Sequence, residues 1–126
     1  MSVDDFAEVG GLISAYFDGL YHADSARLRD VFHPRLAYVC ATEGDEIYLD
    51  LETYMARIDE REGPAARNEP RQEAILEMSF ASPRLAHVTA AMSMMGRRYL
   101  DHLTLVRQGR DWRIISKVFA YVPERG

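Results

Sequence analysis

"RYLDHLTLVRQGRDWRIISKVFAYV", residues 98–122, is the stretch that decides the fold. Apolar and polar residues alternate on both sides of a central QGRD, a pattern that predicts two β-strands joined by a tight turn. Side chains of a strand alternate between its two faces, so Asp101 shares one face with Leu103 while His102 shares the other with Thr104. If the leucine face is buried, an aspartate points into the core and a histidine points away from it.

Two more strands precede this hairpin. Alternating apolar residues predict strands over 72–81 and 85–95, with Leu76, Met78 and Phe80 on one face of the first. Short turns between consecutive strands predict an antiparallel meander. No helix lies among these strands to supply the crossover that a parallel pair needs.

The first half of the chain has helical periodicity. Apolar side chains recur at helical spacing over 2–24, where Ser2 and Asp5 form a capping start. Gly10 and Gly11 lie inside this helix and cost about 1 kcal/mol each relative to alanine. Their presence therefore indicates a close approach of another element.

Two shorter helices are predicted over 25–32 and 51–62, each preceded by an aspartate that can cap it, Asp24 or Asp50. Residues 35–49 between them suggest a small hairpin. Helices followed by long strands predict an α+β fold. We expect a single domain over residues 1–126, with three N-terminal helices packed on a strongly curved antiparallel (mixed) sheet.

Composition excludes several classes of partner. The formal net charge is -5 and there is no basic stripe, so neither nucleic acid nor a membrane surface is an expected partner. Cys40 is the single cysteine, and no basic segment followed by an apolar run opens the chain. The cytoplasm is therefore the expected compartment.

Three segments, 16–38, 51–62 and 99–119, resemble the putative lumazine-binding family, a branch of the NTF2-like superfamily with its SnoaL-like or cystatin-like α+β cone. The resemblance spans nearly the whole chain. The superfamily contains ketosteroid isomerases, polyketide cyclases and non-catalytic domains, so it implies a fold more than a chemistry. It also implies a homodimer that pairs through the outer face of the sheet, which would carry Leu100 and His102.

A cone closed by helices implies a concave pocket for a small, largely apolar molecule. The alternative is that the same side chains fill a solid core. The residues expected to contact the ligand are Phe6, Phe17, Tyr54, Met55, Ile58, Met78, Met92, Tyr99 and Trp112.

Asp101 is the strongest candidate for chemistry, because a carboxyl group in apolar surroundings can act as a general acid. The distant likeness to ketosteroid isomerases implies that Tyr16 assists it. Those enzymes need a second carboxylate, and this chain has Cys40 and Ala41 at the matching strand, so His33 or a water would have to serve as base. The alternative is that Asp101 is a structural group, paired with an arginine or a tyrosine hydroxyl.

No metal-ligand spacing links the four histidines, and no nucleotide-binding glycine motif occurs, so neither a metal nor a cofactor is expected. Three functions stay open. The first is binding of a small ligand, the second a cofactor-independent lyase or isomerase of the polyketide cyclase or ketosteroid isomerase type, and the third a non-catalytic dimerisation module.

Overall fold

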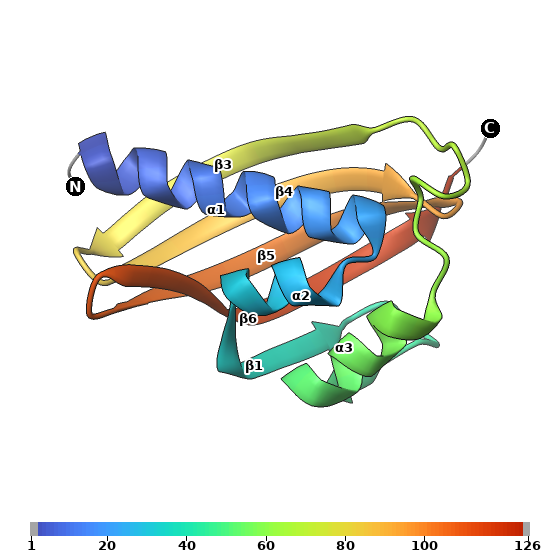
Figure 1. Ribbon diagram of the computed structural model, residues 1–126, viewed down its shortest axis with the longest axis horizontal. Coiled ribbons are helices and arrows are strands. Elements are labelled where there is room, and N and C mark those ends of the chain that lie inside the picture. Colours follow the sequence, from blue (N-terminus) through green and yellow to red (C-terminus); the bar gives the residue numbers. More distant parts are fainter. Residues whose placement is uncertain (1–2, 125–126) are drawn as a thin grey trace.

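The computed structural model of the protein describes residues 3–124 (Figure 1). Its elements follow the order α1 (Val3–His22), α2 (Ser25–Val31), β1 (Phe32–Cys40), β2 (Ile47–Leu49), α3 (Leu51–Glu60), β3 (Gln72–Ser82), β4 (Leu85–Met94), β5 (Arg97–Gln108) and β6 (Asp111–Pro123). The strands form one six-stranded sheet in the order β2-β1-β6-β5-β4-β3, and the helices lie over one of its faces (Figure 1). The predicted α+β class is confirmed. The strong curvature of the sheet stays a prediction.

The sheet is mixed. Strands β1 and β6 pair in parallel, and all other neighbouring strands of the sheet pair antiparallel. The absence of a crossover helix among the last four strands does not prevent this pair. The connection from β1 to β6 instead runs through β2, α3 and the whole meander, which brings the last strand back beside the first. Within the part of the chain that is described, no helix is long and apolar enough to cross a membrane.

Both predicted aspartate caps are present. The Asp24 carboxylate accepts a hydrogen bond from the backbone N–H of Arg27 at 3.1 Å, and that of Asp50 accepts one from Thr53 at 2.9 Å. These bonds satisfy N–H groups that the first helical turn leaves without partners. The capping role predicted for Ser2 lies outside the described residues.

Among the described residues, the close approach expected at Gly10 and Gly11 does not occur, because a Cβ added at either position would meet none of their atoms within 4 Å. It occurs at Gly19 instead, where an added Cβ would lie 2.6 Å from Cδ2 of Leu28. Gly19 therefore allows α2 to pack tightly against α1.

The sequence predicted that Leu76, Met78 and Phe80 share one face of β3, and this prediction is wrong for Leu76. The register of β3 against β4 shifts between Ile75 and Glu77, which marks a β-bulge. Met78 and Phe80 turn toward the core, and Phe80 packs edge-on against the buried Trp112 with ring centroids 5.8 Å apart. Leu76 lies on the opposite face and is 59% exposed.

Candidate functional site

A buried carboxylate lies at the centre of the helix-covered face. Asp101 of β5 is 1% exposed, and the hydroxyl of Tyr16 on α1 donates a hydrogen bond to its Oδ2 at 2.5 Å. No described side chain hydrogen-bonds to its Oδ1. The structure thus brings Asp101 and Tyr16 together inside the fold, a contact that fits both the pairing implied by the likeness to ketosteroid isomerases and the structural alternative of a tyrosine partner.

Lys117 of β6 supplies a buried positive charge beside this carboxylate. Its Nζ lies 3.9 Å from Oδ2 of Asp101 and donates a hydrogen bond to the hydroxyl of Tyr54 at 3.0 Å. The partners expected for Asp101 from the sequence were an arginine or a tyrosine hydroxyl, and Lys117 was not among them. Two signals were available: Lys117 is the only lysine of the chain, and it shares strand parity with the inward-facing Phe119.

Aromatic rings surround the Lys117 ammonium. Its Nζ lies 5.1 Å from the ring centroid of Tyr16, 5.2 Å from those of Tyr54 and Phe119, and 5.7 Å from that of Tyr38. The negative faces of such rings attract a cation and replace part of the hydration that the buried ammonium loses. The site is therefore built to keep a buried positive charge.

The tyrosine hydroxyls of the site are held in their neutral form. Burial raises the pKa of Tyr38 to about 12. Burial also raises the pKa of Tyr54, and it raises the pKa of Tyr16 well above the ordinary value, with the negative charge of Asp101 adding to the effect. Near neutral pH these groups act as hydrogen-bond donors and acceptors rather than as bases.

A cavity of about 120 Å³ opens beside Lys117, and its wall includes Tyr38, Tyr54, Tyr99 and Lys117. Neither Asp101 nor Tyr16 lines it. Lys117 touches both the cavity and the carboxylate, so a ligand in the cavity meets the ammonium first. Asp101 and Tyr16 lie behind it and position it.

The cavity wall carries an excess of positive charge. Arg57 of α3, Arg61 just after it, and Arg97 of β5 line the cavity together with Lys117, against the single carboxylate of Asp45. That carboxylate already accepts a hydrogen bond from the hydroxyl of Tyr121. Within residues 3–124, no salt bridge engages Arg57 or Arg61.

Most of the predicted ligand contacts lie elsewhere. Tyr54 and Tyr99 line the cavity. Three others are core residues away from it, because their side chains are almost fully buried and do not reach its wall: Met55, Ile58 and Trp112. The remaining four are placed apart from the cavity as well: Phe6, which is 52% exposed on α1, together with Phe17, Met78 and Met92.

His33 is not brought to the site. The backbone N–H of Arg35 donates to its Nδ1 at 2.9 Å, so its Nε2 carries the proton and donates to Oε1 of Gln108 at 3.0 Å. Both ring nitrogens are thus engaged, and His33 does not line the cavity. This arrangement suits a structural role at the start of β1 rather than the predicted role of base.

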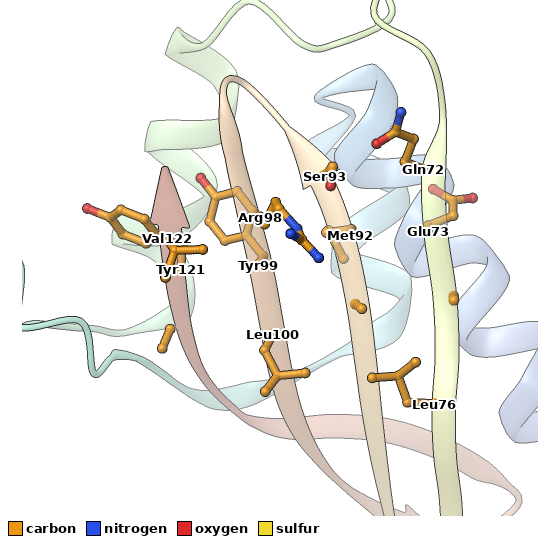
Figure 2. A pocket seen from close by; sticks show the side chains of 13 residues that line it. Gln72, Glu73, Leu76, Met92, Ser93, Arg98, Tyr99, Leu100, Tyr121 and Val122 are labelled. Atoms are coloured by element: carbon orange, nitrogen blue, oxygen red, sulfur yellow. The ribbon is translucent and has the colours of Figure 1, made fainter. Parts of the chain in front are cut away.

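A second hollow lies on the outer face of the sheet, across β3 to β6 (Figure 2). It is an open groove of about 690 Å³. Leu76 and Leu100 point toward each other across β4, and Val122 lies at the side of the groove on β6 (Figure 2). These three side chains are 59%, 42% and 58% exposed, so apolar surface gathers on this face.

Solved structures with the same arrangement define the class of protein. An NTF2-like protein of unknown function from Shewanella baltica is 18% identical, with a TM-score of 0.86 over 98% of this chain and 98% of that chain. An NTF2-like protein of unknown function from Silicibacter pomeroyi is 21% identical, with a TM-score of 0.84 over 97% of this chain and 100% of that chain. A ketosteroid isomerase-like protein from Erwinia carotovora atroseptica is 10% identical, with a TM-score of 0.76 over 98% and 100%. These likenesses show the NTF2-like fold.

The sequence narrows this class to one family. The profile of the putative lumazine-binding family matches residues 4–120, and the chain belongs to that family. The resemblance noted from the sequence is thereby confirmed. No curated protein sequence matches the chain. Because the similar NTF2-like structures are themselves of unknown function, the chemistry of the site has to indicate what this protein does.

Proposed function

We propose that this protein binds a small organic anion, such as a carboxylate, in the cavity beside Lys117. An ammonium group has three N–H donors, and only one of them is used by Tyr54. Asp101 lies at 3.9 Å, beyond hydrogen-bond distance, so it balances the charge without occupying the remaining donors. An acceptor oxygen in the cavity can accept a hydrogen bond from an N–H of Lys117 that no atom of residues 3–124 accepts.

The charge and shape of the wall support an anion with a flat body. Arg57, Arg61 and Arg97 add positive charge that a carboxylate would neutralise, and guanidinium groups match carboxylate geometry well. The rings of Tyr38 and Tyr99 offer flat apolar surfaces nearby. The volume equals on the order of four water molecules, enough for an acidic head group. This ligand is more polar than the largely apolar molecule expected from the sequence.

Binding is better supported than proton-transfer catalysis. A general acid and a general base must both reach the substrate within hydrogen-bond distance. None of the predicted catalytic residues, Asp101, Tyr16 and His33, lines the cavity. The lyase or isomerase alternative therefore has no acid–base pair at the place where a ligand would lie.

Calorimetric titration with benzoate and acetate, against the neutral isosteres benzamide and acetamide, tests the proposal. We expect at least one of the two anions to bind and its amide not to bind. Lys117→Met should abolish binding, whereas Arg110→Met, which removes an equal charge from the exposed β5–β6 turn, should not. Selective labelling of lysine gives one side-chain NMR signal because the chain has one lysine, and this signal should shift on binding. Equal binding of acids and amides, no binding of either acid, or full binding by the methionine variant would contradict the proposal.

We also propose that two copies pair through the outer face of the sheet. The exposed apolar side chains of Leu76, Leu100, Val118 and Val122 support this, since large apolar groups gathered on one face are typical of an interface. Sedimentation of a Leu100→Asp variant tests this pairing.

A further inference from the structure

We propose that His87 of β4 and His102 of β5 form a two-histidine site for a divalent transition metal ion, such as Zn²⁺ or Cu²⁺, on the outer face of the sheet. Nδ1 of His102 lies 3.3 Å from Nε2 of His87. The two rings are tilted by 35° with centroids 5.4 Å apart, so the rings are not stacked face to face. The pair lies outside the Lys117 site and does not rest on the ligand proposed there.

The distance between the two nitrogens matches a shared metal ion. Two imidazole nitrogens, each about 2.0–2.1 Å from a tetrahedral Zn²⁺, lie about 3.3 Å from each other. Without a metal, one proton between His87 and His102 holds them at this separation as a donor and an acceptor. A metal ion that replaces that proton lies off the line between the two nitrogens, so both rings turn by roughly 35° to direct their lone pairs at it.

The sheet register creates the pair. His87 pairs with Thr104 across β4 and β5, and Thr89 pairs with His102, so the two histidines are diagonal neighbours on one face. They come from different strands, 15 residues apart in the chain, and no short motif links them. This explains why histidine spacing in the sequence predicted no metal site.

The surroundings favour a cation that keeps some of its water. Ser79 and Thr104 pair directly with His87, and Thr89 and Val118 pair directly with His102, so no directly paired residue is charged; the nearest carboxylate on this face by register is that of Glu77, which pairs with Thr89. Among residues 3–124, no group of three or more His, Cys, Asp or Glu side chains is arranged to hold a metal. Each single chain therefore supplies two protein ligands, and water completes the coordination where a second copy does not cover the outer face.

Titration of the metal-free protein with Zn²⁺ and Cu²⁺, followed by calorimetry and by NMR of ¹⁵N-labelled histidine, tests this site. We expect one ion per chain, tighter binding of Cu²⁺ than of Zn²⁺, and no binding of Mg²⁺, because imidazole nitrogens select the later transition metals. The ring nitrogens of His87 and His102 should shift, and those of His22 and His33 should not.

Variants decide whether both histidines are ligands. Loss of a residue that only supports a metal ligand weakens metal binding by about tenfold or more. His87→Ala and His102→Ala each remove a ligand itself, so each should weaken binding by at least about tenfold. His22→Ala is the matched control and should bind as the unaltered protein does. Circular dichroism of each variant verifies that it is folded. Undiminished binding by either single variant, or no binding by the unaltered protein, would overturn the inference.

Discussion

Asp101 and His102 are neighbours in the chain, yet they lie in opposite environments on β5. Asp101 faces the helices and is held by Tyr16 from α1 and Lys117 from β6. His102 faces outward and meets His87 of the adjacent strand. A buried charge needs partners from several elements, because desolvation is costly, whereas an exposed group is already solvated. Polar groups on the inner face therefore contribute to the stability of the fold. Polar groups on the outer face contribute little to it and can bind other molecules.

The largest expected effect is the loss of the buried carboxylate. Asp101→Ala leaves Lys117 buried without its counter-charge, and breaking a buried pair in this way costs about 3–5 kcal/mol. His102→Ala, one residue further on, should leave the free energy of unfolding almost unchanged because the side chain is exposed. Denaturant unfolding of both variants measures the difference. Similar values for the two would mean that the faces do not differ as described.

Local patterns were sufficient to predict much of the fold. The alternation around Leu103 placed Asp101 inside correctly, and the aspartates at positions 24 and 50 marked two helix starts. The parallel β1–β6 pair and the bulge beside Leu76 were not predictable in this way. Both depend on which strands meet and in what register, and packing of the whole chain determines that.

The site was predicted only in part, for the same reason. Strand parity placed Asp101 on the inner face, and the likeness to ketosteroid isomerases implied Tyr16 as its partner; the structure contains the hydrogen bond between them. Lys117 was overlooked because lysines are almost never fully buried, so a lysine is normally assigned to the surface. Its enclosure by four aromatic rings comes from α1, α3, β1 and β6, which only the folded chain brings together.

A smaller effect is expected from removing one hydroxyl on the inner face. Tyr16→Phe keeps the ring but removes the donor to Asp101 Oδ2, leaving a buried carboxylate without that bond. The loss should be about 1–3 kcal/mol. Tyr48→Phe makes the same change on a side chain that is 74% exposed, so it should have little effect on denaturant unfolding. A stable Tyr16→Phe variant would show that Lys117 alone satisfies the carboxylate.

The free energy of unfolding at alkaline pH tests whether the inner face keeps the buried Tyr38 hydroxyl protonated. Burial raises the pKa of Tyr38 from 10.0 to about 12, so the unfolded chain loses this proton before the folded protein does. The stabilising contribution is therefore complete below pH 10.0 and is lost as the pH rises toward about 12. Unfolding measured across this range should show a decline that Tyr38→Phe makes shallower. An unchanged slope in that variant would mean that Tyr38 ionises equally in both states.

The smallest effect on the stability of the single chain is expected on the outer face. Leu100→Asp places a charge where a leucine is already 42% exposed, so folding should be affected little, by about 0.5 kcal/mol or less. Pairing of two copies should be lost, because two aspartates would face one another across an apolar contact. Sedimentation velocity measures this loss, and Tyr48→Asp on β2 is the control because it puts the same charge on an exposed side chain away from the groove. Dimers that persist in the Leu100→Asp variant would show that the two copies do not pair at Leu100. Unfolding of the variant would show that Leu100 contributes to the stability of the single chain.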